Sequence, residues 1–478
     1  MINFEYFPNR DQCRLTTSDP NIFQQIREHF SVKNTNAFFM KRSGIRFVKD
    51  RIYAITPTGL FDTGMFYEIY RYILLNYKIE IKFDDKIKNA IKPSFANDAT
   101  PYDNLKLKLR DYQHETVDKA LKFGRGIIKV GTGGGKTLTI ASLISTYYNL
   151  NKDMKVLLIV PDLTLVDQTY KDFISYGVPF KPTRWTGSIE PDITANVLIA
   201  NIGILQSRFE EFDWLTNVDM VVVDECHKLK KGNKVCKLIS KIKTTHKFGL
   251  TGTLPDNKID EWNIIGILGT VFYEKSSFDL RTENYLTNAE IKVLNIKYKT
   301  KVSYIPGVNK FRTELDFIYN NKFRNDVISA VCKKCSNNVL ILVNHIAHGD
   351  NLYKFLTSEL TDRKVYFIRG EVEVEERARV IAEMEKNNNV VCIAISAIFS
   401  TGVNVKNLHM VVFASGGKSF IRTIQSIGRG LRLNPNKEKL VIVDIADLLQ
   451  YSSEHATRRQ QIYTEEKIQY KIGELVEK

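Results

Sequence analysis

The residues best suited to chemistry lie in a glycine-rich segment between an apolar run and a helical stretch. Ile127 to Val130 has the composition of a strand, and Leu138 to Tyr148 has that of a helix. Between them lie Gly131, Thr132, Gly133, Gly134, Gly135, Lys136 and Thr137. Glycines let backbone N–H groups and a helix N-terminus surround a phosphate, Lys136 can reach the β and γ phosphates, and Thr137 can bind Mg²⁺. The segment predicts an ATP site, and a glycine turn that binds no nucleotide is the alternative.

Two acidic residues follow a second apolar run. Met220 to Val223 leads directly into Asp224, Glu225, Cys226 and His227. Ligands of open α/β sheets bind at the carboxyl ends of the strands. Asp224 can hold Mg²⁺, largely through water, and Glu225 can orient and deprotonate the water that attacks in phosphoryl transfer. We expect His227 to couple this site to the rest of the chain, and ordinary solvated charges at a strand end are the alternative.

Two arginines much further along the chain are suited to the same reaction. In the segment from Gln425 to Arg432, Arg429 and Arg432 are three residues apart and share one face of a helix. In an ATPase whose site lies between two domains, such arginines stabilise the charge that develops on the γ phosphate. The alternative is a basic surface helix that contacts backbone phosphates.

Short apolar runs separated by longer helical stretches must position these residues. One series comprises residues 127–130, 156–160, 197–200, 220–223 and 248–250, and a second comprises 339–343, 365–368, 390–395, 410–414 and 440–443. Near-continuous apolar strands that alternate with helices are typical of parallel sheets covered on both faces. Residues 1 to about 100 have short strand-like runs without this alternation, and they end in a small, polar linker. We therefore predict a small α+β domain followed by two α/β domains.

The segments above, in this order, resemble the motifs of superfamily 2 helicases and translocases over about residues 105 to 450. The resemblance implies two tandem RecA-like parallel-sheet motor domains, the first of which binds ATP. On this basis we assign residues 101–280 and 281–450 to the motor domains. The small α+β domain, a candidate DNA-binding domain, takes residues 1–100, and a helical tail takes 451–478.

The same resemblance implies roles for further residues. Arg110 and Gln113 would contact the adenine side, and Gly402 would also touch the nucleotide. Gln425 would join Glu225, Asp224, Lys136, Arg429 and Arg432 in the catalytic set, and Thr251 and Thr253 would couple hydrolysis to strand contact together with His227. The implied contacts to the nucleic-acid backbone are Pro161, Thr164, Gln168, Asn201, Asn344, His345 and Thr401. Three positions depart from the family pattern: Val130 in the phosphate loop, Asp162 and Asn404.

The closer likeness is to the bacteriophage UvsW-type helicases, through the DECH box and the segment from Phe399 to His409. By this resemblance the substrate is branched DNA, such as forks and Holliday junctions, which the enzyme unwinds, anneals and branch-migrates in phage replication, recombination or repair. Three alternatives stay open: an RNA helicase, a duplex-DNA translocase subunit of a restriction-type system, and a passive scaffold whose ATP site switches nucleic-acid affinity.

Composition agrees with a polyanionic partner. The 478 residues include 69 Lys and Arg against 54 Asp and Glu, a net charge of +15, with 43% hydrophobic and 26% charged residues, as in ordinary folded domains. No apolar run is long enough to span a membrane, and the first residues lack a signal-peptide pattern. We expect a cytoplasmic monomer, in the host cell if the source is a phage. Single-stranded or duplex DNA are further expected partners.

Basic residues also cluster near the beginning of the chain. Lys41, Arg42 and Arg46 alternate with aromatic residues such as Phe47 and Tyr53 in a predicted hairpin. Basic side chains can neutralise phosphates while an aromatic ring stacks on an unpaired base. An amphipathic hairpin with buried rings and solvated charges is an equally good interpretation. The three tryptophans, Trp185, Trp214 and Trp262, are expected in the core or at an interface.

Overall fold

The computed structural model describes residues 1–34, 37, 42–44, 48–92, 99–286, 288–304, 307, 309–369, 374–396, 407–415, 439–465 and 467–477. The chain forms two compact units. Residues 1–130 and 135–274 make up the first, and residues 131–134 and 275–478 make up the second. Residues 1–100, which we predict to form a small α+β domain, belong to the first unit.

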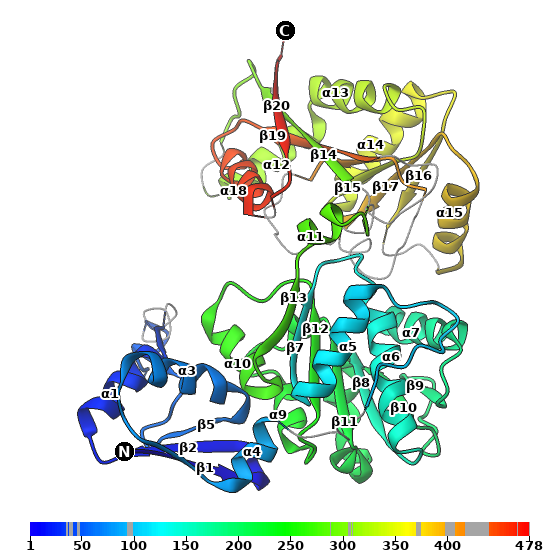
Figure 1. Ribbon diagram of the computed structural model, residues 1–478. Coiled ribbons are helices and arrows are strands. Elements are labelled where there is room, and N and C mark those ends of the chain that lie inside the picture. Colours follow the sequence, from blue (N-terminus) through cyan, green and yellow to red (C-terminus); the bar gives the residue numbers. More distant parts are fainter. Residues whose placement is uncertain are drawn as a thin grey trace. The chain divides into compact units, whose positions relative to one another are not determined.

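The first unit begins with a four-stranded sheet in the order β5-β2-β1-β6 (Figure 1). Strand β1 pairs antiparallel with β2 and parallel with β6, and β2 pairs antiparallel with β5. The strands are β1 (Ile2–Phe7), β2 (Gln12–Thr17), β5 (Leu60–Asp62) and β6 (Ile81–Phe83), and the helices are α1 (Pro20–His29), α3 (Phe66–Asn76), α4 (Asp85–Ile91) and the short 3-10 turns η1 (Pro8–Arg10) and η2 (Thr63–Met65). Mixed strands with helices confirm the predicted α+β composition of this region.

The structure describes only part of the predicted basic hairpin. Strand β4 (Arg51–Tyr53) pairs antiparallel with β3 (Ser31–Lys33). Lys41 and residues 45–47, which include Arg46, lie outside the described residues. The Tyr53 hydroxyl donates to Glu28 Oε1 at 2.7 Å, so a contact within the domain already holds this ring.

The first seven-stranded sheet has the order β13-β7-β12-β11-β8-β10-β9. In this order, all neighbouring strands from β7 to β9 pair in parallel. Its strands are β7 (Gly126–Val130), β8 (Val156–Val160), β9 (Pro182–Trp185), β10 (Val197–Asn201), β11 (Met220–Asp224), β12 (Lys247–Thr251) and β13 (Val271–Lys275). Its helices are α5 (Asp111–Phe123), α6 (Lys136–Leu150), α7 (Leu163–Tyr176), α8 (Ile202–Arg208), α9 (Lys234–Lys241) and α10 (Lys258–Leu268), with the 3-10 turns η3 (Phe209–Glu211), η4 (Asp213–Asn217) and η5 (Cys226–Lys228). All residues of β8, and all residues of β11 before Asp224, are buried, which a strand shows only when both of its faces are covered.

The small sheet and the first motor sheet share one hydrophobic core. This core includes Ile2 and Phe61 from the small sheet, Ile159 from β8 and Ile264 from α10. The backbones come unusually close: a Cβ atom on Gly64 would lie 1.9 Å from the carbonyl oxygen of Ile265. Figure 1 shows the small sheet and its helices beside α10. The N-terminal residues are therefore packed firmly onto the first motor domain.

A buried ionic network joins the same two parts. Asp11, in the turn between β1 and β2, contacts Arg125 at 3.2 Å and Lys247 at 2.8 Å, and both basic side chains are almost fully buried. Arg125 also donates to the carbonyl oxygens of Ala90 and Ile267. Burial alone would raise the pKa of Asp11, but the two cations outweigh it and lower the pKa well below its ordinary range. The carboxylate is thus held ionised.

The second unit contains another seven-stranded sheet, ordered β16-β17-β15-β18-β19-β14-β20, and every neighbouring pair is parallel. The strands are β14 (Asn288–Lys297), β15 (Val339–Val343), β16 (Lys364–Ile368), β17 (Val390–Ile395), β18 (Met410–Phe413), β19 (Lys439–Asp447) and β20 (Tyr470–Val476). The helices are α11 (Ser277–Thr282), α12 (Lys310–Asn320), α13 (Lys322–Lys333), α14 (Ile346–Glu359), α15 (Val374–Lys386) and α18 (Ser452–Glu465). Two tandem parallel sheets with helices confirm the predicted fold class.

The predicted wholly helical tail is wrong at its end. Helix α18 ends at Glu465, and the chain then forms β20, which pairs with β14 from Ile291↔Tyr470 to Lys297↔Val476. From Ile472 to Val476, exposed and half-buried residues of β20 alternate, which fits an edge strand with one covered face. Because β14 is far away in sequence, no local pattern around residue 470 indicates that a partner strand is present.

Two observations concern membranes and metal ions. No described helix is long and apolar enough to cross a membrane. Cys332, which is buried in α13, and Cys335, which is half-buried, form a CxxC pair. Within the described ranges, no group of three or more His, Cys, Asp or Glu side chains is arranged to hold a metal ion.

Candidate nucleotide site and nucleic-acid contacts

The glycine loop connects β7 to α6, as a phosphate-binding loop requires. Val130 is the last residue of β7 and is buried, so its side chain belongs to the strand rather than to the loop. The loop then runs from Gly131 to Gly135, and α6 begins at Lys136. Gly135 precedes the helix with φ +70° and Gly133 has φ +86°, a region that favours glycine. The departure at position 130 therefore leaves the loop itself intact.

Both ends of the loop are crowded. A Cβ atom at Gly131 would lie 2.4 Å from Ser277 Oγ, and the Gly131 amide donates to the carbonyl oxygen of Lys275 at 3.0 Å. At the other end, a Cβ at Gly135 would lie 2.6 Å from Gln113 Nε2. These contacts explain why glycine occupies both positions. The roles of Lys275 and Ser277 had no sequence signal, because they lie more than 140 residues from the loop.

Gln113, a residue of α5, contacts the end of the loop. Its Nε2 donates to the carbonyl oxygen of Gly135 at 3.2 Å, and its Oε1 accepts from the Arg110 amide at 2.9 Å. Arg110 also contacts the hydroxyl of Tyr112. The structure thus brings both residues predicted for the adenine side close to the beginning of α6.

The acidic pair lies at the carboxyl end of β11. Asp224 is the last residue of the strand, and Glu225 has φ +50°, which is unusual for a residue other than glycine. This turn places Glu225 Oε1 3.3 Å from Lys136 Nζ. Both side chains are largely buried, with exposed fractions of 18% and 10%. Lys136, Asp224 and Glu225 therefore share one site, as the sequence predicts.

Burial and the charges within this site shift the pKa values of the two carboxyl groups in opposite directions. Burial, and then the neighbouring Glu225 charge, raises the pKa of Asp224 to about 6. Burial also pushes the pKa of Glu225 upward, but the Lys136 ammonium and the hydrogen bond from His227 outweigh it, and the net shift is downward. Glu225 is therefore the ionised member of the pair while Lys136 remains beside it.

His227 links the acidic pair to the next strand. Its Nδ1 lies 3.3 Å from Glu225 Oε2 and 2.9 Å from Thr251 Oγ1, at the end of β12. Thr251 Oγ1 donates to the carbonyl oxygen of Thr253 at 2.7 Å. A continuous chain of polar contacts thus connects Glu225 to the segment after β12. All three residues predicted for coupling lie in this chain.

The donor chemistry around Asp224 fits Mg²⁺. Asp224 Oδ1 accepts from the Glu225 amide at 2.9 Å, which fixes the carboxylate and leaves Oδ2 as a ligand atom. Thr137, in the first turn of α6, supplies a hydroxyl. Mg²⁺ is commonly held by one or two protein oxygens together with substrate phosphates and water. Two protein donors are therefore sufficient here.

The candidate nucleic-acid contacts of the first unit lie around the beginnings of two helices. Pro161 is half-buried and Thr164 is exposed, next to Asp162, whose Oδ1 caps α7 through the Leu165 amide. Asn201 caps α8 by accepting from the Ile204 amide, and this occupies its carbonyl oxygen. Gln168 is half-buried, and its Oε1 is turned into the protein. Thr164 is thus the best placed of these side chains to reach a phosphate.

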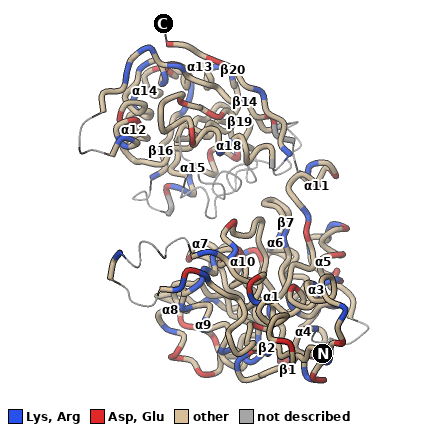
Figure 2. The backbone as a smooth tube through the Cα atoms, turned by 90° about the vertical axis from the view of Figure 1, so that its left-hand side faces the viewer, with Lys and Arg blue, Asp and Glu red and all other residues tan. Residues whose placement is uncertain are grey.

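The second unit provides two more candidates. Asn344 and His345 follow β15, where α14 begins, and His345 is exposed. Arg42, in the N-terminal region, is exposed as well. Lys and Arg positions are spread over both units and alternate with acidic ones (Figure 2). The remaining predicted site residues lie outside the described residues: Lys41, Arg46, Thr401, Gly402, Gln425, Arg429 and Arg432.

Two protein families match the chain. The res subunit of Type III restriction enzymes matches residues 106–256, and the helicase conserved C-terminal domain matches residues 322–434. The ATP-dependent DNA helicase UvsW of Enterobacteria phage T4 is 28% identical over 391 residues, which cover 77% of each chain. These matches cover the segments that carry the predicted motifs of both motor domains.

Solved structures show the same fold. The ATP-dependent Type ISP restriction-modification enzyme LlaBIII, bound to DNA, matches with a TM-score of 0.58 at 13% identity, over 85% of this chain and 34% of that one. Dbp5 of S. cerevisiae, bound to RNA and ADP BeF3, matches with a TM-score of 0.55 at 16% identity, over 77% and 90%. The fold, the nucleotide-site geometry and the family matches together identify the chain as a superfamily 2 ATP-dependent helicase that resembles the UvsW type.

Proposed function

We propose that this helicase remodels branched DNA, by unwinding, annealing and migrating forks and four-way junctions. The observation that carries the proposal is the similarity to a phage DNA helicase over 391 residues, combined with the net charge of +15. The phage relative also supports action in the cytoplasm of an infected cell. We propose that the active form is a monomer, because one chain supplies every residue assigned to the motor.

In the proposed hydrolytic step, Lys136 exchanges one partner for another. Its ammonium leaves Glu225 for the β and γ phosphates of ATP. Without that cation beside it, Glu225 becomes a stronger base and can take a proton from the attacking water. Mg²⁺ held by Asp224 and Thr137 would neutralise phosphate charge. Arg429 and Arg432 are proposed to supply further positive charge to the γ phosphate.

The Glu225–His227–Thr251 contacts support a route from hydrolysis to strand movement. A change in the charge beside Glu225 alters the hydrogen bond to His227, and His227 in turn contacts Thr251 at 2.9 Å. We propose that the segment after β12 responds to this change, and that Thr164, Asn201, Asn344, His345 and Arg42 hold the DNA backbone. Because phosphate contacts dominate such a grip, affinity should fall steeply with salt.

A junction assay tests the proposal. A synthetic four-way junction and a matched linear duplex, each with one labelled strand, are incubated with the enzyme and ATP. We expect conversion of the junction to forked products, with much slower separation of the linear duplex and no product when Glu225→Gln replaces the wild type. Efficient separation of the linear duplex with an unchanged junction would contradict branched-DNA remodelling.

A second candidate is a duplex translocase that moves without separating strands, and the match to a restriction-enzyme subunit over residues 106–256 favours it. Displacement of a third strand from a DNA triplex reports movement along duplex DNA. Triplex displacement without any junction processing would select this candidate over the first.

A further inference from the structure

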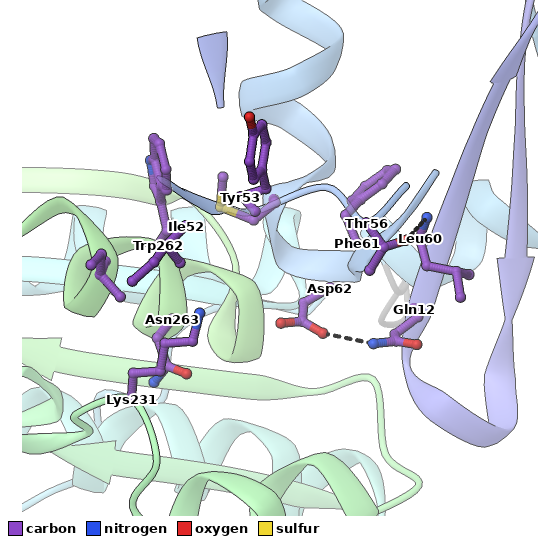
Figure 3. A pocket seen from close by; sticks show the side chains of 13 residues that line it. Gln12, Ile52, Tyr53, Thr56, Leu60, Phe61, Asp62, Lys231, Trp262 and Asn263 are labelled. Atoms are coloured by element: carbon purple, nitrogen blue, oxygen red, sulfur yellow. Dashed lines mark hydrogen bonds between the residues drawn. The ribbon is translucent and has the colours of Figure 1, made fainter. Parts of the chain in front are cut away.

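A cavity lies where the N-terminal sheet packs against the first motor domain. It has a volume of about 190 Å³ and takes walls from both parts of the first unit (Figure 3). Its lining residues include Tyr53, Asp62 and Gln12 from the N-terminal region and Lys231, Trp262 and Asn263 from the motor domain. None of these residues belongs to the nucleotide site, and no helicase motif described above includes them.

Aromatic and apolar side chains form one part of the lining. Trp262 is half-buried and packs against Phe30 with ring centroids 6.1 Å apart, so its ring is held in place. Tyr53 is held by its hydrogen bond to Glu28 and by the Arg27 guanidinium over its ring. In the view of Figure 3, both rings lie on one side of the cavity. Fixed aromatic rings of this kind suit a flat apolar ligand.

Hydrogen-bond acceptors form the opposite part. Asp62 Oδ1 accepts from Gln12 Nε2 at 3.1 Å, which orients the carboxylate and leaves the Gln12 carbonyl oxygen to accept. Asn263 Nδ2 donates to the carbonyl oxygen of Leu229 at 3.0 Å, so its Oδ1 is also available. Surrounding protein atoms raise the pKa of Asp62, although the side chain remains accessible through the cavity. A ligand with N–H donors along one edge would satisfy these acceptors.

Four lysines near the start of α9 form a run in the sequence around Lys231, which lines this cavity. Lys230, Lys231, Lys234 and Lys237 are exposed, and Lys231 itself lines the cavity. Among the described residues, none of these four lysine side chains forms an ion pair. The charge of Lys231 also acts on Asp62 in the same cavity, where it lowers the carboxyl pKa against the effect of burial. Exposed lysines beside an aromatic-lined cavity combine the two elements with which proteins hold single-stranded nucleic acid.

Size restricts what the cavity can hold. Pockets for drug-sized ligands typically measure roughly 300 to 1,000 Å³, and this cavity is smaller. It has room for one flat base but not for a whole nucleotide, so the attached sugar and phosphate must lie outside. The lysine run is positioned to take that phosphate.

We propose that this cavity receives one unpaired base of a DNA strand, and that it prefers a base with an exocyclic amino group, such as cytosine, over thymine. The inference rests on the proposed function, because it assumes that DNA is the substrate. A base held here would anchor the separated strand to the first motor domain.

Oligonucleotide binding at pH 7.5 tests the proposal. Fluorescence anisotropy of labelled 20-nucleotide oligo-dC and oligo-dT gives the affinities of the wild type, Asp62→Ala and the control Asp153→Ala, which changes an exposed aspartate elsewhere in the unit. The wild type and the control should bind oligo-dC at least about fivefold more tightly than oligo-dT. This ratio is the lower end of what one directed base contact contributes. Asp62→Ala should bind the two oligonucleotides equally, with its oligo-dT affinity unchanged.

A second pair of variants tests stacking. Trp262→Leu keeps the apolar bulk but loses the aromatic face, and it should weaken binding of both oligonucleotides about fivefold or more, whereas Trp262→Phe should retain most of the affinity. Thermal midpoints close to that of the wild type, and unchanged ATP hydrolysis without DNA, show that each variant is folded.

The outcomes separate this inference from the function on which it rests. Equal wild-type affinities for oligo-dC and oligo-dT, or a preference that survives Asp62→Ala, would overturn the cavity proposal and leave the helicase assignment standing. Displacement of labelled oligo-dC by free dCMP at the same nucleotide concentration would assign the cavity to a free nucleotide and overturn the strand proposal. Absence of DNA binding by the wild type would overturn both.

Discussion

Lys136 Nζ lies 3.3 Å from Glu225 Oε1, so the lysine that we propose to bind phosphate and the carboxylate that we propose to activate water are partners of each other. This ion pair lowers the pKa of Glu225, which makes it a weak base for as long as the pair persists. We propose that ATP competes for the same lysine, so that nucleotide binding would activate Glu225 as a base.

Replacing Glu225 with glutamine should separate binding from hydrolysis. The amide cannot take a proton, so steady-state hydrolysis should fall by about 100-fold or more, while ATP affinity is retained. Radiolabelled phosphate release and equilibrium binding of a fluorescent ATP analogue measure the two quantities. Glu210→Gln is the matched control, because the Glu210 side chain is 90% exposed and remote from the site. Normal turnover in Glu225→Gln would remove Glu225 from the reaction.

Thr251→Val should uncouple hydrolysis from strand separation. The substitution preserves the shape but removes the hydroxyl that contacts His227 and the carbonyl of Thr253. We expect near-normal DNA-stimulated hydrolysis with fewer base pairs separated per ATP, together with a loss of about 1 to 3 kcal/mol in stability from the unsatisfied buried groups. Parallel loss of hydrolysis and unwinding would assign Thr251 to the hydrolytic step instead.

Asp11→Asn should loosen the N-terminal domain from the motor. It leaves Arg125 and the fully buried Lys247 without a counter-charge. Breaking one member of a buried ionic network typically costs about 3 to 5 kcal/mol, which chemical denaturation would detect as a lower free energy of unfolding. Glu5→Gln removes an exposed ion pair with Arg14 and should cost less than about 1 kcal/mol. Similar effects of the two substitutions would refute the special role of the network.

Titration of His246 should lower the stability as the pH drops from about 6.5 to about 4. Burial lowers the pKa of His246 to about 4, with its Nδ1 hydrogen-bonded to the carbonyl oxygen of Gly124. In this window the unfolded chain binds a proton that the folded chain does not, so acid favours unfolding. The lowered pKa of Asp11 affects the stability only at lower pH, below the ordinary pKa of an aspartate.

Thermal midpoints at pH 7.5 and pH 5.0 measure this effect. His246→Asn, which can still donate to Gly124, should show a smaller drop in midpoint than the wild type. His345→Asn, a change at an exposed histidine, should not alter the drop. Equal drops in the wild type and His246→Asn would contradict the role of His246.

The motor sheets could be predicted because their strands are apolar on both faces. All ten runs singled out from the sequence correspond to observed strands, with boundaries that differ by only a residue or a few. Strands β9, β13, β14 and β20 were not predicted. The β9 segment, from Pro182 to Trp185, is short and begins with a proline, and β20 is an edge strand whose partner lies far away in sequence. Edge strands lack the continuous apolar signal of buried ones.

The nucleotide site was also predictable, because loop, strand end and helix start each have a local pattern. The contacts that support it were not. The Ser277 contact to Gly131 and the Asp11 contacts to Arg125 and Lys247 depend on residues brought together only by tertiary folding. Likewise, the partner of β4 could not be deduced from the alternating pattern around Tyr53, because pattern alone does not choose between neighbouring strands.

Steady-state ATP hydrolysis distinguishes branched DNA from the other candidate substrates. Rates are measured with no nucleic acid, single-stranded DNA, duplex DNA, a four-way junction and a matched RNA, all at equal nucleotide concentration. We expect a low rate without nucleic acid and the strongest stimulation by the junction. Equal or greater stimulation by RNA would contradict the assignment of branched DNA as the substrate.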